Sequence, residues 1–444
     1  MLVRENMLAW MTGIVLALTP VVVAADELAA ICERDPVFSE LEARSDLLML
    51  GRDLFYDPIL SGNREVACVT CHHPDLGTSD GLALGIGDGG FGLGTKRQVD
   101  PKNVPEQRIP RNAQSLFNLG YSEFSVMFHD GRVERLADGS IRTPLGNRAP
   151  DRLLPVLTAQ AMFPVLSQDE MAGHYSENEI SQAVRRGLMT GPSGAHGLLA
   201  ARIAAIPAYR DRFDAVESDV PITYDRIAEA LAAFIAHEWR ADESAFDAYL
   251  CEGKGLTAEA EKGRALFYSK AGCSTCHAGR FQTDHGFHAI AMPQIGPGKA
   301  ERFETHARDI GRMRVTGNAE DAYRFRTPSL RNVALTAPYG HAGAYSALDD
   351  VIRHHANPIA ALNDFKRTRL RLPMLDGASD FRIIEDTSEL AAISAANRLP
   401  PTDLTEDEIM ALIAFLHALT DRRGIEERLG VPETVPSGLP VPTP

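Results

Sequence analysis

The chain has no excess of basic residues. Its 444 residues include 45 Lys and Arg against 60 Asp and Glu, which gives a formal net charge of -15. Because nucleic-acid binders usually present a basic face, this balance argues against a nucleic-acid partner. It would favour encounter with a basic protein, since net charge acts on association and solubility.

Long apolar runs are also missing, except at the N-terminus. Residues 8–23 are mostly apolar, Arg4 precedes them, and Ala24 and Ala25 follow. This pattern predicts a secretory signal peptide over residues 1–25, with an uncleaved membrane anchor as the alternative. No later segment has the roughly 20 apolar residues that a membrane span needs. We therefore expect an exported protein, in a bacterial periplasm, without stable membrane insertion after cleavage.

Cysteines are few, and most of them are in two motifs. Four of the six belong to two Cys-x-x-Cys-His motifs, formed by Cys68, Cys71 and His72 and by Cys273, Cys276 and His277. Cys32 and Cys251 remain. An oxidising compartment permits a disulfide between these two, but the sequence does not give their distance, so a pair and two free thiols both stay open.

The two Cys-x-x-Cys-His motifs predict two covalently bound heme c groups. Each cysteine can form a thioether bond to the porphyrin, and the adjacent histidine can bind the iron. A bare Cys-x-x-Cys could also be a thioredoxin-type pair or half of a zinc site. Here both motifs end in histidine and no further Cys-x-x-Cys lies nearby, which favours heme. His72 and His277 are then the proximal iron ligands.

No alternating strand pattern is as strong as the helical ones. "GRDLFY" precedes the first motif and "GRALFY" the second, which indicates an internal duplication. We predict a mainly α protein with two tandem cytochrome c-like heme domains and long loops, over residues 26–245 and 246–430. The proline-rich end, 431–444, is expected to be a flexible tail. "GIGDGGFG" matches a dinucleotide fingerprint, but it lacks the flanking strand and helix and is interpreted as a loop.

Four segments together resemble one known family. They are "PRNAQSLFN" (110–118), "MFHDGR" (127–132), "AQAMFPVLSQDEM" (159–171) and "RTPSLRNVALTAPYGHAGAYSALDDVIRHH" (326–355). The chain resembles the bacterial diheme cytochrome c peroxidases and the related MauG enzymes over nearly its whole mature length. The resemblance implies that the N-terminal heme meets hydrogen peroxide and that the C-terminal heme is a six-coordinate electron relay. It also implies a calcium ion between the domains.

The same resemblance implies roles for residues near the first heme. Glu170 falls where the family has its distal glutamate, which can take a proton from peroxide and return it to the leaving oxygen. Gln160 falls where the MauG-like branch has a distal glutamine, and Pro164 would be an apolar wall between them. The alternatives are a solvated surface carboxylate for Glu170 and an ordinary helix residue for Gln160.

Further roles concern the second heme and the calcium ion. The resemblance points to the Asn112 side chain and to the backbone carbonyls of Thr336 and Pro338 as calcium ligands, or else to residues that only cap turns. In the family, the sixth ligand of the second iron lies at a fixed sequence separation after the proline of "TAPY". In this sequence that position is His355. His354 and a methionine such as Met313 are the alternatives.

The sequence departs from the family in two places. No histidine occurs between His73 and His129, where the peroxidases have a loop histidine that blocks the first iron, so we expect an open first heme as in MauG. His129 stands where the family has a tryptophan between the hemes, which puts the usual electron route in doubt.

These features leave three hypotheses about function. A peroxidase would draw electrons from a small cytochrome c or a cupredoxin, whereas a MauG-like enzyme would oxidise a partner protein. The third is a non-catalytic diheme electron-transfer cytochrome.

Overall fold

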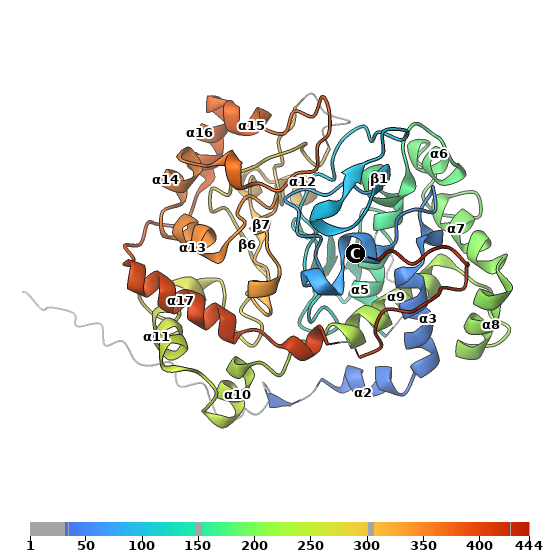
Figure 1. The fold of residues 1–444 in the computed structure, drawn as a ribbon, viewed down its shortest axis with the longest axis horizontal. Helices are drawn as coiled ribbons and strands as arrows, with labels where there is room; N and C mark the ends of the chain where they lie inside the picture. Colours follow the sequence, from blue (N-terminus) through green and yellow to red (C-terminus); the bar gives the residue numbers. More distant parts are fainter. Residues whose placement is uncertain (1–31, 34, 147–152, 301–305, 427, 444) are drawn as a thin grey trace, which may run out of the picture.

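The computed structural model describes residues 32–33, 35–146, 153–300, 306–426 and 428–443. Helices dominate this part of the chain, and its strands are two or three residues long (Figure 1). The prediction of a mainly α fold with long loops is confirmed. The predicted signal peptide lies outside the described residues. Within them, no helix has the length and apolar character needed to cross a bilayer.

The first half of the chain forms eight described α-helices around the first heme motif. They are α2 (Pro36–Glu42), α3 (Ser45–Tyr56), α4 (Cys68–Cys71), α5 (Pro155–Ala161), α6 (Glu179–Arg185), α7 (Ala195–Ala204), α8 (Pro207–Val216) and α9 (Tyr224–Glu238). The antiparallel pair β1 (Gly90–Phe91) and β2 (Gln98–Val99) and the three-stranded sheet β3 (Val126–Met127), β4 (Val133–Arg135) and β5 (Ile141–Arg142) complete it.

The second half places further helices around the second motif. They are α10 (Ala245–Glu252), α11 (Ala258–Phe267), α12 (Met313–Thr316), α13 (Leu348–Ala356), α14 (Pro358–Asn363), α15 (Arg382–Glu385), α16 (Thr387–Ala396) and α17 (Glu406–Ala418). One antiparallel pair joins β6 (Phe287–His288) to β7 (Phe325–Arg326). In Figure 1 the first half lies at the right and the second half at the left.

The duplication seen in the sequence extends to a pair of packed helices in each half. A Cβ atom at Gly51 of α3 would collide with the carbonyl oxygen of Ala230 in α9. In the second half, a Cβ atom at Gly263 of α11 would collide with the carbonyl oxygen of Ala411 in α17. The partner helices share the pattern Ala-Leu-x-Ala-Phe, at 230–234 and 411–415. Glycine is therefore needed at both crossings because the helix backbones touch.

The two largest hydrophobic clusters follow this division for most of their residues. The larger contains buried residues of α2, α3, α5 and α9, and the smaller contains those of α10, α11, α13 and α17. The clusters support a division near residue 245, although the boundary itself stays a prediction.

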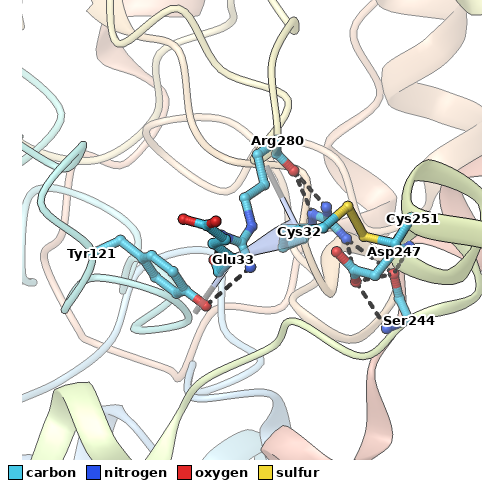
Figure 2. Close-up of a disulfide and its surroundings, with 8 residues drawn as sticks. Cys32, Glu33, Tyr121, Ser244, Asp247, Cys251 and Arg280 are labelled. Carbon is cyan, nitrogen blue, oxygen red and sulfur yellow. Dashed lines mark hydrogen bonds and ion pairs between the residues drawn. A yellow bond between two sulfur atoms is a disulfide. The ribbon is translucent and has the colours of Figure 1, made fainter. Parts of the chain in front are cut away.

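A disulfide fastens the start of the described chain to the second half. Cys32 and Cys251 are bonded, with their Cα atoms 5.7 Å apart. Beside them, Arg280 donates to the carbonyl oxygen of Glu33 and to the Tyr121 hydroxyl (Figure 2). Of the two possibilities that the sequence left open, the structure has the pair.

The prediction of a flexible proline-rich tail over 431–444 is wrong for its described residues, 431–443. This segment (dark red in Figure 1) runs back from α17 across the first half. Ser437 donates to the buried Asp57 at 2.7 Å, and Val435 is only 5% exposed within the larger cluster. The tail is ordered because its apolar residues are buried and its polar groups are paired, which composition alone does not reveal.

A buried arginine ties the two halves together. Arg111 donates to Asp130 at 2.7 Å and to both oxygens of Asp309 at 2.7 and 2.8 Å. The two aspartate side chains are each 1% exposed. Burial alone would raise the pKa of Asp309, but the Arg111 guanidinium outweighs it and holds that pKa below its usual value. Arg111 also lines a cavity at the first Cys-x-x-Cys-His motif, so this contact between the halves lies beside that motif.

Replacing Arg111 with Met should lower the free energy of unfolding at pH 7 by about 3–5 kcal/mol, because two buried carboxylates lose their partner. The pKa of Asp309 lies below its unfolded value of about 3.9, so the pair's contribution is present above that pH and is lost as the pH falls through the folded value. Denaturant unfolding of the holoprotein at pH 7 and pH 3 measures this. The difference in unfolding free energy between wild type and variant should be smaller at pH 3.

The matched control is Arg185→Met. Arg185 makes a surface pair with Glu106 at 2.6 Å, and such pairs contribute about 1 kcal/mol or less. Equal losses of stability in the two variants would contradict the role given to Arg111.

Candidate functional site

The first Cys-x-x-Cys-His motif forms a single helical turn, α4, that His72 follows. The His72 Nδ1 atom lies 2.9 Å from the carbonyl oxygen of Thr78. That bond places the proton on Nδ1 and leaves the Nε2 lone pair free for a metal. Burial raises the pKa of Cys68 and Cys71 to about 12. A thioredoxin-type pair needs a lowered thiol pKa, so these two thiols do not suit that role.

A cavity opens at this motif and gathers residues that are far apart in the sequence. Its empty volume is about 1270 Å³, counted to its open mouth. Gln160, Pro164 and Glu170 line it together with the two cysteines and His72. Much of the remaining wall is apolar, from Phe55, Leu60, Val66, Leu116, Leu157, Val165, Leu231 and Ile235. A mostly apolar wall with a few convergent polar groups fits a porphyrin.

Glu170 lies on a π-helical turn, η5 (Gln168–Ala172), a structure that is frequent at functional sites. Its carbonyl oxygen accepts from the backbone amide of Asp88 at 3.1 Å. A Cβ atom at Gly87 would collide with the backbone oxygens of residues 169 and 170. The glycine run at 85–92 is thus a loop apart from the two residues of β1, and the glycine at 87 allows the two backbones to meet. This contact fixes the backbone of Glu170 at the cavity.

Gln160 lies on α5 and points a buried polar atom at the site. The residue is 7% exposed and lines the cavity. Its Oε1 atom is buried without a hydrogen-bond partner among the described residues. Because a buried amide oxygen without a partner is costly, this atom is evidence for a ligand in the cavity.

The second motif has the same local geometry. Cys273–Thr275 form a short 3-10 turn, η6, and the His277 Nδ1 atom lies 3.0 Å from the carbonyl oxygen of Gln282. Burial raises the pKa of Cys273 to about 12. Burial, with His355 adding to it, lowers the pKa of His277 to about 4, so the imidazole is neutral and able to bind a metal.

His355 is the residue that α13 places in front of His277. The two ring centroids are 6.5 Å apart. An iron that holds two imidazoles at about 2 Å separates their ring centres by roughly 6 Å, so the gap fits one metal ion. The His355 Nδ1 atom lies 2.7 Å from the carbonyl oxygen of Val351, which leaves Nε2 free.

His354, the neighbouring alternative, has both ring nitrogens engaged. Its Nδ1 atom is 2.8 Å from the Tyr345 hydroxyl, and its Nε2 atom is 2.8 Å from the carbonyl oxygen of Ile290. A ring with two such partners has no lone pair left for iron. The geometry therefore favours His355 over His354.

The residues suggested for calcium lie near the contact between the two halves. The backbone amide of Asn112 donates to the carbonyl oxygen of His341, in the loop that contains Thr336 and Pro338. The Asn112 Nδ2 atom donates to the carbonyl oxygen of Leu82 at 2.8 Å, so its Oδ1 atom remains as an acceptor. In the described part of the chain, no hydrogen bond ends on the carbonyl oxygens of Thr336 or Pro338. These oxygen donors suit a hard cation.

His129 contacts both halves of the protein. Its side chain lines the first heme cavity, and its carbonyl oxygen accepts from the backbone amide of Arg326 in β7 at 2.8 Å. Since β7 pairs with β6, hydrogen bonds link the backbone of His129 to this strand pair of the second half. Trp239 instead packs on Phe55 and Phe234 within the core of the first half.

The sequence did not single out Lys299 as a site residue. Lys299 lines the first cavity, and its Nζ atom lies 3.8 Å from Glu170 Oε1. No motif surrounds it, and it follows the second heme motif in the chain although it borders the first heme site. Only the contact between the halves brings it there.

Comparison with known proteins agrees with the geometry. The family model described as di-haem cytochrome c peroxidase matches residues 45–255. The methylamine utilization protein MauG of Methylorubrum extorquens is 31% identical over 310 residues, which cover 69% of this chain and 67% of that protein. The cytochrome-c peroxidase IdrP1 of Denitromonas iodatirespirans is 28% identical over 87% of this chain and 84% of its own length.

A solved structure has a similar fold over nearly the whole chain. It is that of a MauG-like protein associated with microbial copper homeostasis, with 25% identity and a TM-score of 0.57. The alignment covers 94% of this chain and 97% of that one. The family predicted from the sequence motifs is thereby confirmed. The chain belongs to the diheme cytochrome c peroxidase and MauG family of oxidoreductases.

Proposed function

We propose that this protein is an exported diheme oxidoreductase that reacts with hydrogen peroxide at the heme held by His72. The heme held by His277 and His355 relays the electrons. The observation that carries the proposal is the cavity shared by His72, Gln160 and Glu170. Relatives named as cytochrome c peroxidases support peroxidase chemistry. The disulfide between Cys32 and Cys251 fits an oxidising compartment such as the bacterial periplasm.

At the first site, heme c supplies an iron that can bind and reduce an oxygen ligand. The Glu170 carboxylate takes a proton from hydrogen peroxide and returns it to the leaving oxygen. The Gln160 amide has hydrogen-bonding capacity left for the bound ligand, because its Oε1 atom has no partner among the described residues. Pro164 contributes an apolar wall that limits water around both groups.

At the second site, His277 and His355 would both bind the heme iron, which would leave no position for peroxide. This heme would serve as the electron relay, and the hydrogen bonds through His129 and β7 would connect it to the first cavity. A calcium ion held by Asn112, Thr336 and Pro338 would stabilise the contact between the halves. Its removal should then loosen that contact.

The source of electrons separates two versions of the proposal. A small cytochrome c or a cupredoxin as donor would make the protein a peroxide-detoxifying enzyme. A side chain on a partner protein would make it a maturation enzyme, as the relationship to MauG suggests. The open first heme expected from the missing loop histidine favours the second version. A net charge of -15 would assist encounter with a basic partner in either version.

The first heme should be high-spin in the resting ferric protein, because the sequence has no histidine between His73 and His129 to block it. The second heme should be low-spin. Electron paramagnetic resonance of the oxidised protein measures both signals. The rival hypothesis of a non-catalytic diheme electron-transfer cytochrome expects two six-coordinate, low-spin hemes, and that result would overturn an open peroxide site.

Stopped-flow mixing with hydrogen peroxide then tests the function itself. The proposal expects a rapid change in the heme spectrum after mixing with peroxide. Mixing with an equal volume of buffer without peroxide is the control and should give no such change. A spectrum that stays the same over minutes would refute peroxide chemistry.

A further inference from the structure

We propose that Lys299, from the second half of the chain, is a positioning residue that keeps the Glu170 carboxylate directed into the first heme cavity. This inference deepens the proposed function and rests on it for the role of Glu170. The Lys299 Nζ atom lies 3.8 Å from Glu170 Oε1, and both side chains line the cavity. Lys299 is 22% exposed and Glu170 is 25% exposed, so the pair is shielded from much of the solvent.

The other charged groups nearby are already engaged. Arg111 is held between Asp130 and Asp309. Arg132 pairs with Asp130 at 3.1 Å, and its guanidinium lies 3.5 Å from the centre of the Phe128 ring. Among the described residues, the ion pair found for Glu170 is with Lys299. Lys299 is therefore the cation within ion-pair distance of the carboxylate, and Arg132 also attracts the carboxylate through space.

The loop that carries Lys299 is anchored to the tie between the halves. The Gln294 side chain donates to the carbonyl oxygen of Ala307 at 2.6 Å and accepts from the amide of Asp309 at 2.9 Å. A Cβ atom at Gly298 would lie 2.6 Å from the carbonyl oxygen of Ala307, so the backbones touch there. Asp309 in turn binds Arg111, which lines the cavity. Lys299 is thus positioned by the same contact that joins the two halves.

Four charged groups act on Lys299. Burial lowers the pKa of Lys299, and Arg132 and Arg111 lower it further, whereas Glu170 and Asp130 raise it. The ammonium attracts the Glu170 carboxylate, so losing Lys299 should remove a contact that keeps the carboxylate in place. A displaced Glu170 cannot reach the proton of an incoming ligand.

Cyanide binding to the ferric first heme tests this without the peroxide reaction. Hydrogen cyanide must give up its proton when it binds, so its association rate reports the proton acceptor in the cavity. Lys299→Met should slow this association by about tenfold at constant pH, because the carboxylate is no longer held at the cavity. Lys299→Arg should stay within about twofold of the wild type, because it keeps the charge.

Two further variants keep the test specific. Lys262→Met removes an equal charge from the exposed pair with Glu259 on α11 and should leave the cyanide association rate unchanged. In a Glu170→Gln background, Lys299→Met should have no further effect, because the group it positions is gone. The inference is overturned if Lys299→Met leaves the rate unchanged, or if its effect persists in that background.

Electron paramagnetic resonance of the resting protein gives a separate check. If the first heme is low-spin in the wild type and becomes high-spin in Lys299→Met, Lys299 is an iron ligand and the inference is wrong. If the wild type does not react with peroxide but Lys299→Met still slows cyanide binding, only the proposed function is refuted, and the role of Lys299 stands.

Discussion

Replacing Glu170 with Gln should slow the reaction with hydrogen peroxide by at least about 10²-fold, the usual scale for a lost general acid–base group. The amide has nearly the same shape as the carboxylate, but it cannot accept and return a proton. The backbone of residue 170 is held by Asp88 and by the contact with Gly87, so the new side chain should remain at the cavity. Stopped-flow spectra of wild type and variant after peroxide mixing measure the change.

Asp169 provides a matched control on the same π-helical turn. Its Oδ2 atom accepts from the Gln107 side chain at 2.9 Å, and the residue is not among those that line the cavity. Asp169→Asn should therefore keep a rate within a few-fold of the wild type. Both variants should contain two hemes by pyridine hemochrome assay. Unchanged peroxide rates in Glu170→Gln would show that another group handles the proton.

Replacing His355 with Ala should convert the second heme from low-spin to high-spin and leave the first heme unchanged. The variant loses one of two strong nitrogen ligands, and water or an empty position takes its place. The reduction potential of this heme should also rise, by a shift on the order of 0.1 V, since axial ligands tune heme potentials over a wide range. Electron paramagnetic resonance and a spectroelectrochemical titration measure these two changes.

His354→Ala is the matched control for this prediction. Its ring is bound to Tyr345 and to the carbonyl oxygen of Ile290, so its loss should leave the second heme low-spin. If the low-spin signal persists in His355→Ala and disappears in His354→Ala, then His354 is the ligand. Persistence in both variants would direct attention to a methionine such as Met313.

The ligand pair affects what the second heme can store. A His/Met pair raises the heme potential, because thioether favours the ferrous state. Two imidazoles should therefore lower the reduction potential of the second heme. It should then be oxidised more readily than a relay heme with a methionine ligand. That behaviour suits an enzyme that holds oxidising equivalents until a reductant arrives. It would favour the version of the proposed function in which a partner protein is the substrate.

Much of the site could be predicted because it depends on short spacings and on family motifs. A cysteine pair three positions apart and the next histidine must lie on one turn, whatever the rest of the fold does. The internal duplication was visible as the repeated segments "GRDLFY" and "GRALFY" ahead of the two motifs. Glu170, Gln160 and His355 came from the resemblance, and the geometry gathers the first two in one cavity and places the third before His277.

Other features were decided only by tertiary structure, because they depend on distances across the fold. Nothing in the spacing of Cys32 and Cys251 shows that their Cα atoms lie 5.7 Å apart. The tail has the composition of a flexible segment, and it is ordered because the first half offers Asp57 and an apolar surface to it. Lys299 has no motif around it and reaches Glu170 because Arg111 and Asp309 join the halves. Local spacing determines which residues can share a turn, whereas packing determines which turns meet.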